Sequence, residues 1–217
     1  VLNELDNSSI RQNTGAVTTT LNLRYQPLDE LFFNAVVSAN VQNATIENWW
    51  GEQSHYVGSL RRAEYGEEIP SDSNLPYGGQ FGRQTNKTVG WTTRLQGNYN
   101  KYFGPLMQQN VNVALGFEAS GSHYTGDSYT KRGYYADRGR SFATNIPTSY
   151  TTYWNWMQTN TPTITDTRSN ILSAYATLSY SFRDLFTANV NGRFDGSNKF
   201  GSRSNEKFLP VWSASGM

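Results

Sequence analysis

Two aromatic groups, Trp49-Trp50 and Tyr153-Trp154-Asn155-Trp156, stand out among the side chains that could recognise a ligand. Such rings combine a large contact area with a polar handle, which suits stacking on sugar rings or packing at protein interfaces. Local packing within a loop, or an aromatic girdle at a membrane surface, explains the same residues. A third candidate is the run at residues 131–140, which mixes basic and aromatic side chains and includes Tyr134 and Tyr135.

Little in the sequence predicts catalysis or metal binding. Residues 195–198, DGSN, offer oxygen ligands, but Lys199 takes a ligand position of the EF-hand pattern and no glutamate closes the loop, so an Asx-type turn is the better interpretation. The two histidines, His55 and His123, lack both Glu-x-x-His spacing and a nearby cysteine. No nucleophile elbow and no supported carboxylate pair is present. We therefore expect no catalytic residue, no metal site and no cofactor.

The composition of the 217-residue chain narrows the class of protein. Charged residues make up 16% of the chain and the net charge is +1, so nucleic acid is not an expected partner, even at residues 131–140. There is no cysteine, which excludes a disulfide framework. Mean hydropathy is −0.65. No apolar run approaches the ~20 residues of a membrane-spanning helix, although alternating strands can hide a membrane barrel from this test.

Alternation of apolar and polar residues predicts about seven antiparallel strands. Within residues 170–182, Leu172 and Ala174 fall on one face of the strand, whereas Ser173 and Tyr175 fall on the other. The same pattern recurs at residues 14–25, 31–42, 88–99, 111–122 and 186–195, and from about Lys207 onward. The sequence therefore predicts a sheet with one apolar and one polar face. Aromatic residues near the expected strand ends, such as Trp91, are typical of interfacial girdles.

Short and long connections alternate between these strands. Short turns are expected at residues 26–29, 102–109 and 183–184, and long loops at about 43–86 and 124–169. Loops this long are uncommon in compact soluble domains and are typical of outer-membrane barrels. The apolar faces carry no charge, and the charged residues of the strands fall on the polar face: Arg24, Arg94, Glu118, Arg193 and Asp195. A soluble β-sandwich alternates in the same way and stays the alternative.

Residues 191–201, NGRFDGSNKFG, are followed by KFLPVWSAS at residues 207–215. Together they resemble the R-x-D-G-S-S-x-F … F-P-x-x-S signature of the SusC/RagA family of TonB-dependent outer-membrane transporters. LNLRY at residues 21–25 and LGFEAS at residues 115–120 are similar to other strands of that family. One departure is visible, because Leu209-Pro210 stands where the family has Phe-Pro, with Phe208 one place earlier.

The resemblance implies an all-β fold, an antiparallel transmembrane β-barrel segment with long extracellular loops and short periplasmic turns. The family barrel has 22 strands around an N-terminal plug. Residues 1–217 would form one part of that barrel, with about seven of its strands and no plug domain. Both ends of the chain are interpreted as cuts, since it does not begin with Met and Met217 falls within a strand pattern.

The resemblance also implies a role and partners. The family imports oligosaccharides or peptides across the bacterial cell outer membrane, with energy from TonB-ExbB-ExbD delivered through the plug that is absent here. A SusD-like lipoprotein covers the extracellular mouth, and outer-membrane lipid surrounds the barrel. The five strand charges would face the lumen, and residues 131–140 would contact the lid or lipopolysaccharide. The aromatic residues expected at the substrate or the lid are Trp49, Trp50, Tyr134, Tyr135, Tyr153, Trp154 and Trp156. A soluble or surface-attached β-sandwich that binds glycans remains the alternative, and neither is an enzyme.

Overall fold

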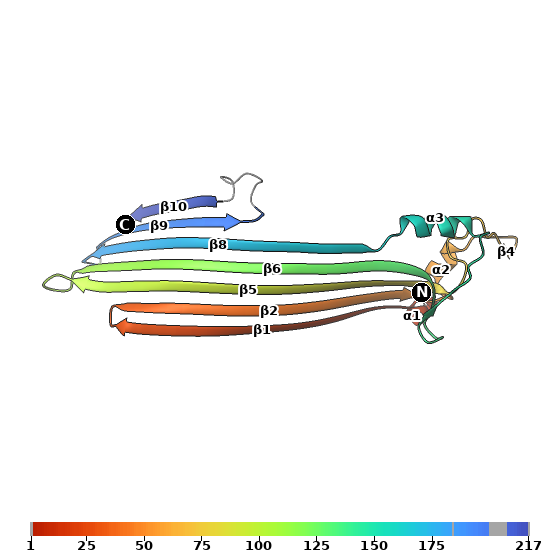
Figure 1. Ribbon diagram of the computed structural model, residues 1–217, viewed down its shortest axis with the longest axis horizontal. Coiled ribbons are helices and arrows are strands. Elements are labelled where there is room, and N and C mark those ends of the chain that lie inside the picture. Colours follow the sequence, from red (N-terminus) through yellow and green to blue (C-terminus); the bar gives the residue numbers. More distant parts are fainter. Residues whose placement is uncertain (1, 184, 200–207, 217) are drawn as a thin grey trace. The chain divides into compact units, whose positions relative to one another are not determined.

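The computed structural model describes residues 2–183, 185–199 and 208–216 and consists mainly of antiparallel strands (Figure 1). Its long strands neighbour one another in the order β1-β2-β5-β6-β8-β9-β10. They are β1 (Ser8–Leu28), β2 (Leu31–Trp50), β5 (Gly79–Phe103), β6 (Gln109–Tyr135), β8 (Thr163–Phe182), β9 (Phe186–Ser197) and β10 (Phe208–Gly216). The predicted all-β antiparallel fold is confirmed. Asp184, Phe200, Gly201 and Lys207, which belong to predicted turns, strands or the signature, lie outside the described residues.

The strands are much longer than the sequence pattern predicted. β5 contains 25 residues and β6 contains 27, so large parts of the expected loops, including residues 43–50 and 79–87, are strand. Trp91, expected near a strand end, lies in the middle of β5. The prediction was wrong because residues 42–48 and 82–87 carry polar side chains on both faces, which removes the contrast that marks a strand. Their backbone groups pair with neighbouring strands all the same.

Short elements precede the first long strand and fill connections between the later ones. The helices are α1 (Leu2–Asn7), α2 (His55–Leu60) and α3 (Thr151–Thr159). The side chain of Ser54 caps α2 by accepting a hydrogen bond from the backbone N–H of Val57, at 3.2 Å. β3 (Ala63–Glu64) pairs with β4 (Glu67–Glu68), and β7 (Ser141–Phe142) pairs with β6. Among the described residues, no helix has the length and apolar character needed to cross a membrane.

The chain divides into two compact units. The first unit comprises residues 1–15, 42–87 and 125–166, and the second comprises residues 16–41, 88–124 and 167–217. The charge-free apolar strand faces predicted from the sequence all fall within the second unit.

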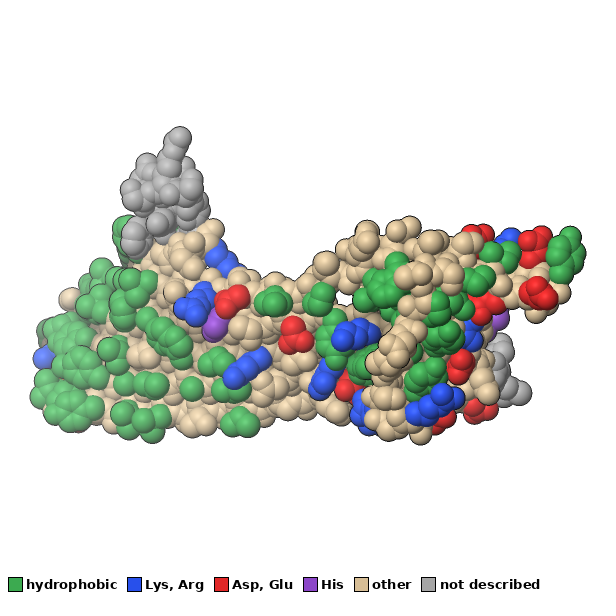
Figure 2. Space-filling model, turned by 45° about the vertical axis from the view of Figure 1, so that its right-hand side comes forward, with side chains coloured by type: hydrophobic (Ala, Val, Ile, Leu, Met, Phe, Trp, Pro, Cys, Tyr) green, Lys and Arg blue, Asp and Glu red, His purple; other side chains and the backbone are tan. Residues whose placement is uncertain are grey.

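The two faces of the second unit differ sharply. On one face large apolar side chains lie open, and Leu95, Leu115 and Leu178 expose 51%, 59% and 46% of their surface. Figure 2 shows hydrophobic side chains gathered over the part of the sheet next to the short turns. The other face carries polar and charged side chains, in the register that pairs Ser173 with Asp195 and Tyr175 with Arg193. The sequence prediction of one apolar and one polar face therefore holds in the structure.

A glycine on the polar face makes room for an aromatic ring. A Cβ at Gly116 of β6 would overlap the phenol ring of Tyr175 from β8, so the ring lies directly over the glycine. The Tyr175 hydroxyl then reaches β5 and donates a hydrogen bond to Oε1 of Gln96, at 2.8 Å. Tyr175 thus ties three neighbouring strands together.

We expect Gly116→Ala to lower the free energy of unfolding by about 1–3 kcal/mol, because the added methyl forces the Tyr175 ring off its seat. Gly192→Ala is the matched control, since nothing lies within 4 Å of a Cβ at that position. Thermal unfolding of the two variants beside the parent protein measures the difference. Equal midpoints for both variants would contradict the packing described for Tyr175.

Candidate functional site

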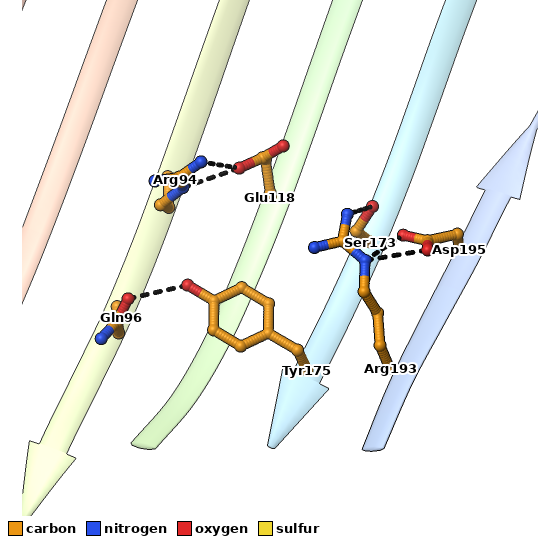
Figure 3. A network of polar contacts seen from close by, with 7 residues as sticks. All are labelled: Arg94, Gln96, Glu118, Ser173, Tyr175, Arg193 and Asp195. Carbon is orange, nitrogen blue, oxygen red and sulfur yellow. Dashed lines mark hydrogen bonds and ion pairs between the residues drawn. The ribbon is translucent and has the colours of Figure 1, made fainter. Parts of the chain in front are cut away.

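The polar face of the second unit carries a network of charged and hydrogen-bonding side chains (Figure 3). Nε of Arg94 on β5 donates to Oε2 of Glu118 on β6, at 2.6 Å. Because Arg94 is about half exposed and Glu118 is mostly covered, the pair is partly open to solvent. Opposite charges directly across two strands favour this register.

A second part of the network joins β8 and β9. Nε of Arg193 lies 2.8 Å from each carboxylate oxygen of Asp195, and its NH2 group donates to Oγ of Ser173, at 3.2 Å. Ser173 is almost fully buried beneath this contact. Four of the five predicted strand charges therefore form ion pairs on the same face. The fifth, Arg24, stacks on the ring of Phe32 at 4.2 Å instead.

In the first unit, the adjacent tryptophans Trp49 and Trp50 contact different groups of residues. Trp50 packs on the ring of Tyr56 with centroids 4.9 Å apart, whereas Trp49 packs on the ring of Tyr134, at 6.5 Å. Both tryptophans end β2, so neighbouring side chains fall on opposite faces of the strand. The sequence treated them as one loop pair, and that placement was wrong because β2 continues through Trp50.

The group around Trp50 forms a continuous chain of contacts that ends on helix α3. The hydroxyl of Tyr56 accepts a hydrogen bond from Nε2 of Gln80, at 3.2 Å, and Oε1 of Gln80 accepts one from Nε of Arg132, at 3.1 Å. The guanidinium of Arg132 lies 3.8 Å from the ring centroid of Trp156 in α3. Sequence reasoning found the two tryptophans and the run that contains Arg132, and missed Tyr56 and Gln80, which have no distinctive spacing.

Arg132 is the most deeply buried cation of this unit, with 9% of its surface exposed. Burial lowers the pKa of its guanidinium, and the hydroxyl of Tyr56 opposes that shift. A second hydrogen bond, from NH1 to the carbonyl of Asn74 at 2.8 Å, helps to replace the lost water. Burial also raises the pKa of the neighbouring Tyr153, so this phenol stays neutral beside the cation. Arg132 is therefore a fastening point between β6 and α3.

A polar hollow of about 340 Å³ is lined by residues of β2, β5 and β6 and of the segment that follows α3. Amide and hydroxyl groups dominate its lining, from Asn48, Gln84, Ser128, Thr130 and Asn160. Asn160, which follows α3, donates from Nδ2 to the carbonyl of Thr130, at 2.7 Å. The side chain of Asn48 rests where a Cβ at position 82 would stand, so a larger residue than Gly82 would displace it. Arg83 adds one cation to this lining, which suits a polar ligand rich in hydrogen-bonding groups.

The side chains grouped around Trp49 are aromatic. Tyr134, which is 4% exposed, contacts the rings of Phe81 and Phe142 at 4.8 and 5.4 Å. Phe81 also contacts Tyr129, at 6.3 Å. Strict alternation along β6 would put Tyr129 and Tyr134 on opposite faces, and Gly133, with a φ of +87°, supplies the bulge that brings both to one face.

The remaining sequence-predicted aromatics lie in β6 and in α3. Tyr135 lies under the guanidinium of Arg138, at 4.4 Å, and Tyr153 is buried between Trp154 and Trp156. Trp154 is partly exposed and donates from Nε1 to the carbonyl of Pro147, at 3.2 Å. Tyr153, Trp154 and Trp156 lie in α3 rather than in an irregular loop. Among the described residues, no group of three or more His, Cys, Asp or Glu side chains is placed to hold a metal ion.

The sequence matches no protein-family model and no curated protein. Its fold is similar to one part of three solved structures. A solved structure of the RagAB peptide transporter superposes on 97% of this chain with a TM-score of 0.70 and 12% sequence identity. Structures of the RagAB peptide importer in its closed-closed and open-open states give TM-scores of 0.72 and 0.71, each at 13% identity. The chain spans 20% of the length of those chains, and at such identity the likeness is one of fold.

We expect Arg132→Met to loosen the segment that contains α3. The change removes two hydrogen bonds and a cation–π contact, a loss of about 2–4 kcal/mol of local stability. Limited proteolysis should show faster cleavage within residues 143–162 than in the parent protein. Arg62→Met, at an exposed arginine of the same unit, serves as the control. Cleavage at equal rates in both variants would contradict the fastening role.

Proposed function

We propose that this chain is part of the β-barrel of an outer-membrane importer. The observation that carries the proposal is the open apolar face of the second unit. In each long strand that face holds no charge over a stretch such as residues 31–41 of β2, 89–99 of β5 and 111–121 of β6. A tilted strand needs about 9–11 residues to cross the hydrocarbon core of a bilayer. The opposite face, with its ion pairs, is suited to a polar lumen.

The sandwich alternative fits the structure less well. A β-sandwich buries its apolar face against a second sheet. In the part of the chain that the structure describes, the long strands all belong to one sheet. Soluble monomers rarely expose apolar patches beyond a few hundred Å². Lipid on this face explains the exposure of Leu95, Leu115 and Leu178 without a second sheet.

The likeness to RagAB extends the proposal to the whole transporter. In the described sheet β1 and β10 each have a single neighbour, and open strand edges are not viable in lipid. Further strands of a larger, 22-stranded barrel would complete the pairing. Energy would come from TonB-ExbB-ExbD through a plug outside these residues, and a SusD-like lipoprotein would serve as the lid. The family resemblance is the ground for proposing both partners.

The substrate of the proposed importer is an oligosaccharide or a peptide. The RagAB structures are those of a peptide transporter, and both substrate classes carry many neutral hydrogen-bonding groups. The polar hollow beside Asn48 and Gln84 offers matching amides and hydroxyls. Trp50 and Trp156, joined through Arg132, would frame this contact, and the partly exposed Trp154 would face the lid. The paired charges of Figure 3 would line the lumen.

A charge placed on the apolar face should block assembly, whereas the same charge one residue away should not. Leu178→Arg puts a cation where lipid is expected, at a cost of about 2–4 kcal/mol near the bilayer midplane. Thr177→Arg puts it on the polar face of the same strand. The amount of full-length protein in the outer-membrane fraction measures the effect. Equal yields of the two variants would refute the proposed membrane face.

The hollow can be tested through uptake. Gln84→Leu removes hydrogen-bonding capacity from the lining, and the loss of one bond worth about 0.5–1.5 kcal/mol predicts a KM for uptake raised about 2–12-fold. Thr85→Val, at the next position of β5, is the control on the opposite face. Transport of labelled oligopeptides and oligosaccharides by cells that produce each variant gives KM and maximal rate. An unchanged KM for both substrate classes would show that the hollow does not contact the transported substrate.

A further inference from the structure

An ion pair marks the end of the apolar face of the second unit, next to the short turns. Nζ of Lys101 on β5 lies 3.6 Å from Oε1 of Glu30, which belongs to the turn between β1 and β2 (Figure 1). More than a third of each side chain is exposed, so both charges are open to a ligand. The pair lies wholly within the second unit and belongs neither to the network of Figure 3 nor to the polar hollow.

The strand register places this ion pair on the apolar side of the sheet. The ring of Phe33 on β2 lies against Gly97 of β5. Three residues further along each strand, the backbone N–H of Asn100 donates to the carbonyl of Glu30, at 2.8 Å. Equal steps along both strands leave no bulge between these two contacts. Lys101 therefore stands on the apolar side with the other odd-numbered residues of β5.

The charge-free stretches of two strands end at this pair. On their apolar face, residues 31–41 of β2 and residues 89–99 of β5 carry no charge. Glu30 comes directly before the first stretch, and Lys101 is the next residue after the second on the same side of β5. In the membrane location proposed above, both strands leave the hydrocarbon at this point. Lipid headgroups lie directly beyond the hydrocarbon.

The side chains around the ion pair are aromatic. Phe103 is the next residue on the same side of β5, and its ring centroid lies 5.9 Å from Nζ of Lys101. Tyr25 of β1 and Phe33 of β2 are exposed on the same side of the sheet. Aromatic side chains are enriched at the level of the headgroups. The position of the pair and its neighbours therefore both indicate a headgroup environment.

The charges at this turn are unequal. Asp29, directly before Glu30, adds a second carboxylate, and its backbone carbonyl accepts a hydrogen bond from Nε2 of Gln26, at 3.2 Å. Two carboxylates beside one ammonium group disfavour a headgroup that carries negative charge alone. A zwitterionic headgroup matches them, because its ammonium donates to carboxylates while its phosphate accepts from Lys101.

We infer that the turn at Glu30 and Lys101 binds the headgroup of a zwitterionic phospholipid with a primary ammonium group, of the phosphatidylethanolamine type. Nζ of Lys101 holds the phosphate, and the carboxylates of Glu30 and Asp29 accept hydrogen bonds from the ammonium. This inference rests on the proposed membrane location and deepens it, because it assigns a preferred lipid to the apolar face. The alternative is an exposed ion pair that binds no ligand.

The test uses the full-length protein, purified in detergent and freed of bound lipid. Phosphatidylethanolamine or phosphatidylglycerol with the same acyl chains is added, and native mass spectrometry gives the Kd of the first bound lipid. The parent should bind the ethanolamine lipid about fivefold more tightly than the glycerol lipid. Glu30→Gln should reduce this preference to less than about twofold, because the ammonium loses an acceptor. Lys101→Gln should weaken both lipids about threefold, since both carry the phosphate.

Glu52→Gln is the matched control, because it removes a carboxylate from another exposed ion pair, with Arg61 in the first unit. This variant should keep the preference of the parent. Equal binding of the two lipids by the parent, an unchanged preference in Glu30→Gln, or unchanged binding in Lys101→Gln would overturn the inference. Thermal unfolding midpoints show whether each variant is folded. Failure of the proposed function gives a different result, because the parent would then be absent from the outer-membrane fraction, whatever it binds in detergent.

Discussion

Each backbone N–H and C=O of a long strand needs a partner, and in an antiparallel sheet the neighbouring strands provide it. That pairing fixes where the side chains point, because successive residues must stand on opposite faces. The two faces of this sheet consequently meet two environments, and the composition of each face can be read separately. The apolar face of the second unit and its polar counterpart both follow from this one constraint.

The sequence predicted those parts of the fold in which successive residues of a strand alternate in polarity. Leu172 and Ser173 differ in polarity, so β8 was recognised there, and the tight turn before Phe186 was clear. The outer parts of β2 and β5 were missed because Asn48, Gly82 and Gln84 make both faces polar. Pairing with neighbouring strands maintains the strand in those segments, and a single sequence carries no record of that pairing.

The candidate site was predicted by residue type and not by arrangement. Alternation alone placed the expected strand charges on one face, whereas the ion pairs that four of the five form there depend on which residues lie next to one another. Arg132 was included only as one member of the run at residues 131–140, because its importance comes from burial beside Gln80 and Trp156, which are distant in sequence. Trp49 and Trp50 were seen as one pair, and only the continuation of β2 separates them. Long-range packing, which decided both cases, has no signature in local composition.

The bulge at Gly133 changes the phase of β6. Up to Arg132 the even-numbered residues follow Glu118 onto the polar face, whereas Tyr134 joins the aromatic cluster of Phe81 on the other. Tolerance to substitution should therefore alternate along β6, and the tolerated positions should switch between odd and even numbers at Gly133. Any alignment or design that assumes unbroken alternation would assign the last residues of β6 to the wrong face. The identity of one glycine thus determines which environment the residues after it experience.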